Sequence, residues 1–259
     1  MEPDPIDGPL VKGTVMIQPS RIEVSIVMPA YNEEANIEST VRESMQVLER
    51  ERISGEVIVT DDGSKDGTLG ILERLGECYS NFRYVHLEQN VGYGGALKRA
   101  IDISRGEYVV TIDSDGQFDI GDLPRLLCKV REGHDCVTGY RTRKKDTLPR
   151  VLANRGYNFL VSLLCGLSFR DAQCALKIYR GEILRSLTLE ARGFPFPTEA
   201  LVKLHYCGGS IAEVPVTHRF RKGGKSKVSF FQTVRIMFIF LLYVRFKVAL
   251  HKSKVIYTI

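Results

Sequence analysis

Runs of apolar residues alternate with stretches of helical spacing along the first 140 residues. The runs, rich in Val and Ile, fall at residues 23–29, 56–61, 82–87, 107–112 and 135–140. Unbroken runs of β-branched residues are typical of strands buried on both faces, and apolar residues three and four apart are typical of amphipathic helices. Strands that alternate with helices predict βαβ units. We therefore expect an α/β fold, with a Rossmann-like, mostly parallel sheet and helices on both faces.

The second half of the chain is less regular. Helical patterns occur at residues 149–167, 198–206 and 228–250, and short strand patterns at 176–179 and 210–216. Four prolines in residues 1–20 predict a flexible leader. We divide the rest into a catalytic domain, 21–227, and an apolar juxtamembrane helix and tail, 228–259. Within the domain we expect a nucleotide-binding half to about residue 140 and an acceptor half over about 141–227.

Composition limits the class of protein without fixing its function. The chain has 259 residues, of which 44% are hydrophobic and 26% charged, with a net charge of +5. These values are ordinary for a globular protein. The six cysteines form no C-x-x-C pair and no signal peptide is apparent, so we expect reduced thiols in the cytoplasm. No apolar run reaches the length needed to span a bilayer.

The last helical pattern has an uncharged centre. Ile236–Val244 carries no charge, and Arg235, Arg245 and Lys247 flank it. This segment could belong to the core, form a dimer face, or lie in the headgroup layer of a membrane. We favour the interfacial position, on the cytosolic face of a membrane, because the segment has more aromatic residues than a small core needs.

Two carboxylates follow the strand predicted at 107–112. Asp113 and Asp115 are separated by Ser114 and followed by Gly116 and Gln117. The carboxyl ends of strands are where open α/β sheets bind ligands. Oxygen donors there suit a divalent cation that shares substrate phosphates, with Gln117 as a third donor. A plain polar turn is the alternative, since Asp, Ser and Gly are turn residues.

Two further polar clusters end the first two strands. They comprise Pro29–Glu33 and Asp61–Ser64. Their carboxylates and the ring of Tyr31 suit a nucleobase and a ribose. Alternatively, Asn32, Ser64 and Asp66 cap the following helices. The Gly-rich segment 90–96 lacks the lysine of a P-loop, so we interpret it as a close strand-to-helix turn, with phosphate binding as the alternative.

The basic residues gather downstream. Arg141 follows the fifth strand, Arg150 and Arg155 lie on the next helix, and residues 219–227 form a basic loop around Gly223-Gly224. A nucleic-acid surface is disfavoured because no recognisable reading helix accompanies the loop, in which Phe220 is the single aromatic residue. The remaining interpretations are a solvated loop and a glycine-hinged lid that closes over phosphates.

The order of these motifs resembles glycosyltransferase family 2. The segments are VSIVMPAYNEE, VTDDGSKDGT, IDSDGQ, TGYR and EVPVTHRFRKGGKSK. Within that family the chain resembles the polyprenyl-phosphate branch typified by dolichyl-phosphate mannose synthase, over about residues 22–230. The resemblance implies a GT-A type fold and an inverting, metal-dependent transfer of a hexose, mannose or glucose, from a nucleotide-sugar to a polyprenyl or dolichyl phosphate.

The resemblance also assigns residues by position. The nucleotide-sugar would contact Pro29, Tyr31, Glu33, Thr60, Asp62, Asp113, Ser114, Asp115, Arg141, Arg221 and Lys227. The metal, Mg²⁺ or Mn²⁺, would bind Asp113, Asp115 and Gln117, and the catalytic set would be Asp115, Arg141 and Arg221. Arg150 and Asn154 would meet the acceptor phosphate, although relatives usually have a serine in place of Asn154. A carboxylate that some relatives carry is replaced here by Ala175.

The missing carboxylate bears on the acceptor. A lipid monophosphate is already an anion and needs no general base, whereas a hydroxyl acceptor does; Asp171 is a weak candidate for that base. The expected partners are GDP-mannose or UDP-glucose, the lipid phosphate and a membrane surface, with a membrane subunit or a homo-oligomer as further options. A soluble glycan or protein acceptor is the second hypothesis, and a non-catalytic nucleotide-binding subunit is the third.

Overall fold

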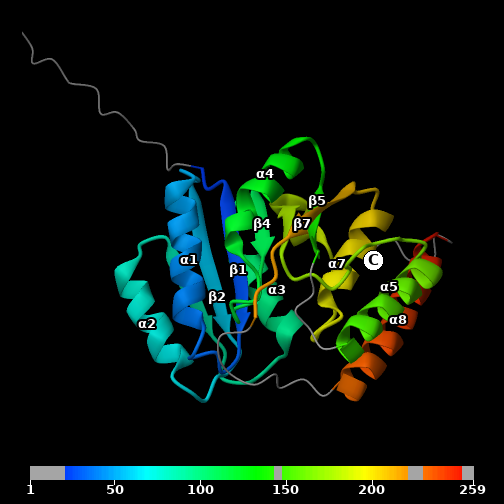
Figure 1. The fold of residues 1–259 in the computed structure, drawn as a ribbon, viewed down its shortest axis with the longest axis horizontal. Coiled ribbons are helices and arrows are strands. Elements are labelled where there is room, and N and C mark those ends of the chain that lie inside the picture. Colours follow the sequence, from blue (N-terminus) through cyan, green and yellow to red (C-terminus); the bar gives the residue numbers. More distant parts are fainter. Residues whose placement is uncertain (1–20, 143–147, 221–229, 253–259) are drawn as a thin grey trace, which may run out of the picture.

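The computed structural model describes residues 21–142, 148–220 and 230–252. The predicted leader, 1–20, and the basic residues Arg221 and Lys227 lie outside these ranges. Seven strands form one sheet in the order β3-β2-β1-β4-β6-β5-β7 (Figure 1). The strands are β1 (Val24–Ala30), β2 (Gly55–Asp61), β3 (Phe82–His86), β4 (Tyr108–Thr111), β5 (Cys136–Arg141), β6 (Lys177–Arg180) and β7 (Ile211–Val216).

Helices connect the strands. They are α1 (Ile37–Arg50), α2 (Thr68–Cys78), α3 (Tyr93–Ile103), α4 (Leu123–Arg131), α5 (Leu148–Cys165), α6 (Gly181–Ser186), α7 (Phe196–Tyr206) and α8 (Phe230–Lys252). A 3₁₀ turn, η1 (Ile120–Asp122), precedes α4. The predicted strands and long helices are all present with small shifts of their ends; α6 and η1 were not predicted, because neither is long enough to show a helical period.

The sheet is mostly parallel, as predicted. Strands β1, β2, β3 and β4 run parallel to one another, and β5 and β7 run parallel to each other. Only β6 runs antiparallel, to both β4 and β5. Every residue of β1 is buried, which agrees with its place near the centre of the sheet. In the edge strand β3 only Phe82 is buried, and the positions after it alternate between half-buried and exposed.

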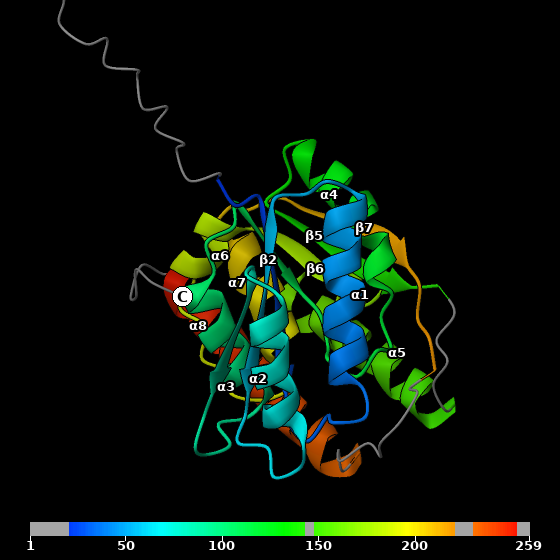
Figure 2. The ribbon, with the colours of Figure 1, turned by 90° about the vertical axis from the view of Figure 1, so that its left-hand side faces the viewer.

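Helices cover both faces of the sheet, and two apolar clusters hold them there. The first includes Ile26 and Met28 of β1 and side chains of α1, α2 and α4. The second includes Val27 of β1 and side chains of α3, α6 and α7. Figure 2 shows α1 and α2 in front of the strands from one side. Neighbouring residues of one strand thus serve opposite faces, so an unbroken apolar run is what β1 requires.

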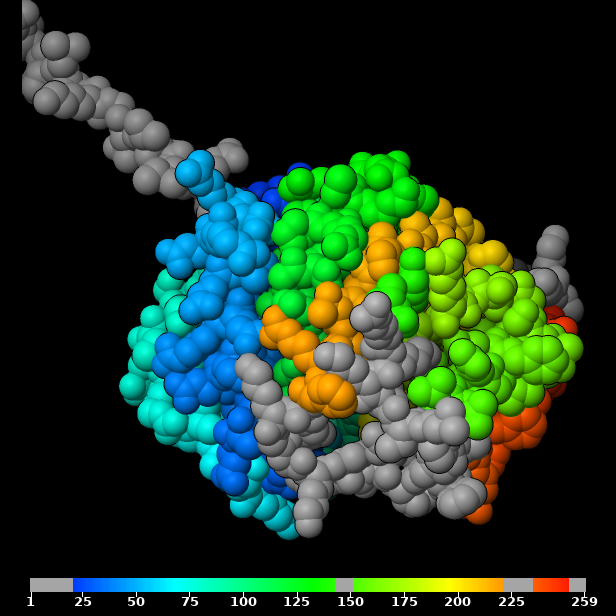
Figure 3. Space-filling view, viewed as in Figure 1, coloured from blue at the N-terminus to red at the C-terminus, as the bar shows by residue number. Residues whose placement is uncertain are grey.

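A third cluster lies at the end of the sheet away from α2. It packs Tyr157 and Val161 of α5 against Leu241 and Val244 of α8, with Val202 of α7 beside them. The two helices lie side by side in Figure 1 and at the right-hand end of the surface in Figure 3. Within the described ranges, no helix combines the length and the apolar character that crossing a bilayer requires.

Candidate functional site: an acidic loop at the switch point of the sheet

The candidate site lies where the strand order changes direction. From β1 the chain moves to β2 on one side, whereas β4 pairs with the other side of β1. Ala30 is in register with Asp61, and Val27 with Thr111. The loops after β1, β2 and β4 therefore leave the sheet at the same edge, which is the edge where open α/β sheets bind ligands.

The loop after β4 carries the predicted metal ligands and is held from several sides. Asp113 Oδ1 accepts a 2.9 Å hydrogen bond from the hydroxyl of Tyr93, and Asp115 Oδ1 accepts one of 3.0 Å from the backbone N–H of Gln117. The buried Ser114 donates to the carbonyl of Pro29 at 2.8 Å. Ser114 and Pro29, both predicted to touch the nucleotide-sugar, thus join the acidic loop to β1.

The charge of Asp115 perturbs the neighbouring carboxylate of Asp113. Burial and the charge of Asp115 raise the pKa of Asp113 to about 7, against the lowering effect of the Tyr93 hydrogen bond and of the charges on Arg141 and Lys177. Bringing two carboxylates together in a partly desolvated place is unfavourable unless a cation joins them. Oxygen donors of this kind fit Mg²⁺ or Mn²⁺.

No group of three or more His, Cys, Asp and Glu side chains is arranged around a metal position in the described ranges. The donor set is therefore a pair of carboxylates with the Gln117 amide near them in sequence. Such a pair leaves much of a cation's shell to water and ligand phosphates, which is how Mg²⁺ is commonly bound beside nucleotides. The residues fit a metal that arrives with its nucleotide.

The loops after β1 and β2 are joined to each other. The backbone N–H of Asn32 donates to Ser64 Oγ at 2.8 Å, and Asn32 Oδ1 accepts from the N–H of Lys65 at 2.6 Å. The capping interpretation is wrong for Asn32 and Ser64, because α1 begins after Asn36 and α2 after Gly67. These side chains instead hold the two loops together, and Asn32 adopts a positive φ of 52° to do so.

The predicted nucleotide residues differ in their surroundings. Both oxygens of the Asp62 carboxylate accept backbone N–H groups, from Val91 at 2.7 Å and Gly92 at 3.0 Å. Burial raises the pKa of Asp62, and these two bonds act in the opposite direction. Tyr31 presents 37% of its surface. Thr60 is fully buried, and its hydroxyl has no hydrogen-bond partner among the described residues.

Glu33 has a structural role at the start of α1. Its carboxylate accepts from the amide of Asn36 at 2.9 Å, and its backbone N–H donates to Thr68 Oγ1 at 2.9 Å. The backbone carbonyl of Glu33 also accepts from the N–H of Ile37. A nucleotide contact at Glu33 remains a prediction from the resemblance.

The Gly-rich segment is a close turn, as interpreted from its sequence. The N–H groups of Gly94 and Gly95, at the start of α3, donate to the carbonyl of Arg192. A Cβ on Gly94 would lie 2.0 Å from the carbonyl oxygen of Ala191, so only glycine fits there. The N-terminus of α3 is thus engaged by protein backbone. The same contact places Phe194 against the ring of Tyr93, with ring centroids 5.6 Å apart.

The basic side of the site is built around Asp171. Arg141, at the end of β5, forms an ion pair with this buried carboxylate, with Nε to Oδ2 at 2.7 Å and Nη2 to Oδ1 at 3.1 Å. Asn154 of α5 donates to the same Oδ1 at 3.1 Å. Two residues predicted to contact the donor and the acceptor therefore meet at one carboxylate. The sequence had offered Asp171 only as a weak candidate base.

The other predicted basic residues are less defined. Arg150 lies in the first turn of α5, and Arg221 and Lys227 fall outside the described ranges. The segment that leads to the basic loop is fixed beside the acidic loop, because the N–H of Arg219 donates to the Gln117 carbonyl at 2.7 Å. The Arg219 guanidinium also pairs with Glu43 at 2.9 Å and Asp119 at 2.6 Å.

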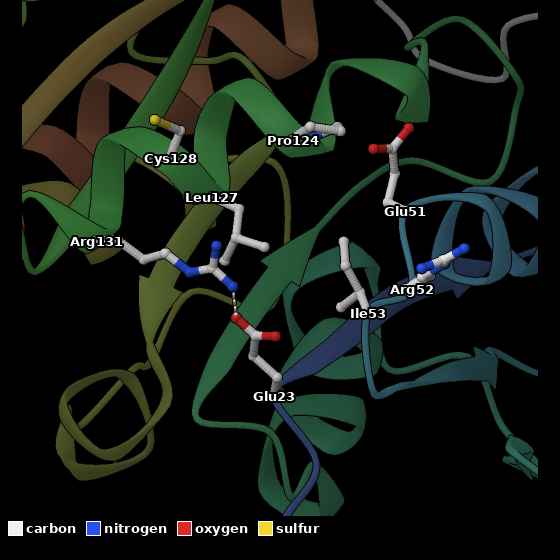
Figure 4. Close-up of a pocket in the computed structure, with 8 residues that line it drawn as sticks. All are labelled: Glu23, Glu51, Arg52, Ile53, Pro124, Leu127, Cys128 and Arg131. Atoms are coloured by element: carbon white, nitrogen blue, oxygen red, sulfur yellow. Dashed lines mark hydrogen bonds and ion pairs between the residues drawn. The ribbon is translucent and has the colours of Figure 1, made fainter.

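A small pocket at the opposite edge of the sheet is not part of this site (Figure 4). It is lined by Glu23, Glu51, Arg52, Ile53, Pro124, Leu127, Cys128 and Arg131. Glu23 precedes β1 and Ile53 precedes β2, so the pocket lies at the amino ends of these strands. In Figure 4 the Arg131 guanidinium points toward the Glu23 carboxylate, with which it forms an ion pair.

A doubly covered α/β sheet with an aspartate pair and two further polar loops at its switch point defines a domain of the nucleotide-binding GT-A type. The chain belongs to one family of such enzymes, glycosyl transferase family 2, because the profile of the family described as "Glycosyl transferase family 2" matches residues 25–188. The matched residues run from β1 to beyond α6 and include the acidic loop, Arg141 and Asp171.

Curated relatives of the chain are glycosyltransferases or sugar-phosphate synthases, and two of the three that follow are named for a polyprenyl phosphate. The chain is 37% identical over 204 residues to glycosyltransferase AglD of Haloferax volcanii, an alignment that covers 75% of this chain and 33% of the relative. It is 32% identical over 219 residues to dodecaprenyl-phosphate galacturonate synthase of Rhizobium johnstonii, covering 83% of this chain and 64% of the relative. A third relative is undecaprenyl-phosphate 4-deoxy-4-formamido-L-arabinose transferase of Salmonella choleraesuis, at 28% identity, with 65% of it covered. The chain thus spans between about a third and two thirds of these relatives' lengths.

Solved structures with a similar fold include glucosyl-3-phosphoglycerate synthase of Mycobacterium tuberculosis. Its complex with Mn²⁺, UDP and glucosyl-3-phosphoglycerate gives a TM-score of 0.67 at 26% identity, covering 86% of this chain and 79% of that one. Its complex with Mn²⁺, UDP-glucose and phosphoglyceric acid gives a TM-score of 0.68 at 26% identity, with the same coverage. The predicted GT-A type fold is confirmed by this similarity.

Proposed function

We propose that this protein is an inverting, metal-dependent glycosyltransferase that moves a hexose from a nucleotide-sugar to a polyprenyl phosphate at the cytosolic face of a membrane. The observation that carries the proposal is the contrast between the two sides of the site. The donor side presents paired carboxylates, Asp113 and Asp115, whereas on the acceptor side the candidate base, Asp171, is engaged by Arg141 and Asn154.

The state of Asp171 favours an acceptor that needs no base. Its side chain is only 1% exposed and forms a bidentate ion pair with a guanidinium. A carboxylate paired in this way is a poor proton acceptor, because protonation would leave the buried guanidinium without its partner. A hydroxyl acceptor would require such a base, whereas a phosphate monoester already carries negative charge at neutral pH.

The reaction can then proceed in a single displacement. An oxygen of the acceptor phosphate forms a bond to the anomeric carbon while the bond from that carbon to the donor diphosphate breaks, and the nucleoside diphosphate leaves with the electron pair. No proton has to be removed. Attack opposite the leaving group inverts the configuration at the anomeric carbon.

The chain's residues would supply charge screening. A cation held by Asp113, Asp115 and Gln117 would stabilise negative charge on the departing diphosphate. Arg141 would screen the approach of one anion to another, with Arg150, Arg221 and Lys227 as further contributors. The exposed ring of Tyr31 is where the nucleotide would make a contact. The Thr60 hydroxyl, which is buried and has no hydrogen-bond partner among the described residues, is a second candidate. The donor itself, GDP-mannose, UDP-glucose or a related sugar nucleotide, is left open by these residues.

The paired helices α5 and α8 support the membrane assignment. Each buries one side in the third apolar cluster and exposes large apolar residues on the other. On α8, Ile239 is 58% exposed and Phe246 is 62% exposed, and on α5, Phe159 is 65% and Leu163 is 66% exposed. Apolar side chains exposed together on neighbouring helices mark a surface that meets a partner or a membrane. A polyprenyl phosphate is reached from such a surface.

A comparison of acceptors would test the proposal. The protein is incubated with Mn²⁺ and a panel of radiolabelled nucleotide-sugars, with a short polyprenyl phosphate, the matching polyprenol without phosphate, or 3-phosphoglycerate. We expect label to enter the organic phase only with the polyprenyl phosphate, and with one nucleotide-sugar far more than the rest. Transfer to the free alcohol at a similar rate would contradict the argument that the acceptor must arrive as an anion.

A soluble phosphorylated acceptor is the second candidate, and one observation favours it. Structures of similar fold hold glucosyl-3-phosphoglycerate together with UDP, or phosphoglyceric acid together with UDP-glucose. Such an acceptor is also anionic, but it requires no apolar surface on α5 and α8. Transfer to 3-phosphoglycerate and none to the lipid phosphate would establish this function in place of the first.

A further inference from the structure

Asp171 lies at the junction of three elements. It follows α5 and precedes β6, and its side chain is 1% exposed. Its Oδ1 accepts from Asn154 Nδ2 and from Arg141 Nη2, and its Oδ2 accepts from Arg141 Nε. The backbone N–H of Arg141 approaches the same Oδ2 at 3.4 Å. One carboxylate therefore holds a side chain from β5 and another from α5.

The backbone around Asp171 is held as well. The Glu213 carboxylate of β7 accepts from the N–H groups of Arg170 and Asp171. The Asn158 side chain donates to the Arg170 carbonyl at 2.9 Å and accepts from the N–H of Ala172 at 3.2 Å. Bonds on both sides of Asp171 leave its carboxylate little freedom to move. It can therefore serve as a fixed reference point for the groups bound to it.

The Arg141 guanidinium lies between this anchor and the acidic loop. Its Cζ is 6.0 Å from the centre of the Phe118 ring, one residue beyond Gln117. The Arg141 side chain is 13% exposed, so most of its surface is already covered. A planar guanidinium held at two of its nitrogens has a fixed orientation.

We propose that Asp171 is a positioning residue, which fixes Arg141 toward the diphosphate of the donor and Asn154 toward the acceptor from a single buried anchor. The inference rests on the proposed function for the identity of the two ligands. It assigns to Asp171 a role opposite to that of a general base: the carboxylate stays ionised and paired throughout the reaction, and its effect on catalysis passes through Arg141.

A base and a positioning residue differ in what their loss changes. Loss of a base lowers kcat, removes the acidic limb of the pH profile of kcat, and leaves the affinity for a nucleoside diphosphate unchanged. Loss of an anchor frees the guanidinium and lowers that affinity. It also makes the effect of changing Arg141 smaller, because residues that act through one contact are not additive.

The experiment is a double-mutant cycle on the full chain. Affinities for UDP and GDP with Mn²⁺ are measured by calorimetry for the wild type, Asp171→Asn, Arg141→Lys and the double variant, with thermal unfolding followed in parallel. Glu56→Gln is the matched control. Glu56 is also a buried carboxylate paired with an arginine, Arg83, at 3.2 Å, but it lies at the start of β2, the opposite edge of the sheet.

We expect Asp171→Asn to weaken binding of the preferred nucleoside diphosphate by on the order of 10-fold. It should lower kcat by up to about 100-fold, the loss that a small misplacement of a catalytic group produces. The double variant should bind no more weakly than the weaker single variant, and Glu56→Gln should bind like the wild type. Wild-type affinity in Asp171→Asn, or additive losses in the cycle, would overturn the proposal.

Two further arms keep the test decisive. If Asp171→Asn does not fold, Asp171→Glu retains the charge but displaces the anchor by one methylene, and wild-type affinity in that variant would overturn the proposal. Because binding of the nucleoside diphosphate is measured without any acceptor, the cycle still reports on Asp171 if no lipid phosphate accepts sugar. That outcome would contradict the proposed function alone.

Discussion

The exposed apolar surface of α8 offers a quantitative test of membrane binding. Phe246 is 62% exposed on the face of α8 turned away from the third apolar cluster. A phenylalanine side chain can bury roughly 200 Å², so about 120 Å² of Phe246 is available to a membrane. At about 25 cal/mol per Å², burying this surface is worth up to about 3 kcal/mol. Phe246→Glu removes this contribution and adds a carboxylate to the interface.

The assay is co-sedimentation of the full chain with vesicles of phosphatidylcholine and anionic phosphatidylglycerol. A loss of about 3 kcal/mol corresponds to a partition coefficient lower by on the order of 100-fold. Arg74→Gln is the control, because it makes the same change of net charge on α2, where the Arg74 guanidinium donates to the Gly70 carbonyl. We expect Arg74→Gln to bind vesicles like the wild type.

Membrane binding also links to activity. Phe246→Glu should lower transfer to polyprenyl phosphate in vesicles much more than transfer to a short acceptor dissolved in detergent. Equal vesicle binding by a folded Phe246→Glu variant and the wild type would refute the assignment of α8 to the membrane surface. The exposed apolar residues would then belong to a protein interface, which a concentration-dependent change in oligomeric state would reveal.

Three further predictions concern stability and the metal site. Gly94→Ala should lower the free energy of unfolding by at least about 2 kcal/mol in urea titrations, because the added Cβ meets a carbonyl oxygen at 2.0 Å. Gly70→Ala on α2, where the added Cβ meets open space, should instead raise the free energy of unfolding by about 0.5–1 kcal/mol. Burial acts to raise the pKa of Glu190, but hydrogen bonds from two lysines outweigh it and lower the pKa to about 2. The contribution of Glu190 to the free energy of unfolding should therefore be complete above about pH 4.5 and fade as the pH falls toward 2. Glu190→Gln should flatten the dependence of the free energy of unfolding on pH in that range. Tyr93→Phe removes the hydroxyl that donates to Asp113. Because a hydrogen bond to a charged group contributes about 1.5–3 kcal/mol, this variant should bind Mn²⁺ with a nucleoside diphosphate roughly 10-fold more weakly in calorimetry. Unchanged affinity would show that this bond does not organise the metal ligands.

The Glu190 cluster also connects α8 to the site. Glu190 accepts from Lys203 of α7 and from Tyr243 and Lys247 of α8, at 2.9, 3.0 and 2.7 Å. The same segment of chain continues to Phe194, which stacks on Tyr93. The orientation of α8 against the domain and the surroundings of the acidic loop therefore share one connecting segment.

Much of the fold could be predicted because a strand that is buried on both faces of the sheet has apolar residues at successive positions. The run VSIVMPA of β1 is apolar throughout, since Ile26 and Val27 pack into different clusters. The direction of β6 could not be predicted, because the residue pattern of a four-residue strand such as Lys177–Arg180 does not indicate whether the strand runs parallel or antiparallel to its neighbours. Its antiparallel pairing depends on the path of the chain after α5.

The site was only partly predictable from the sequence. Asp113 and Asp115 stand out because carboxylates directly after a buried strand have few structural reasons to be there. The contact of Asn32 with Ser64 crosses between two loops, and the contact of Asp171 with Arg141 joins residues 30 positions apart. Neither local spacing nor residue type reveals such pairs, because folding brings them together.

The most direct test of the account is transfer of a radiolabelled hexose into an organic-extractable lipid by the wild type and by Asp115→Ala. We predict label in the lipid phase when polyprenyl phosphate, the preferred nucleotide-sugar and Mn²⁺ or Mg²⁺ are all present, and its loss on chelation or in Asp115→Ala, while thermal unfolding of the variant remains cooperative. Undiminished transfer by Asp115→Ala would contradict the role given to the acidic loop, and label confined to water-soluble products would contradict the lipid acceptor.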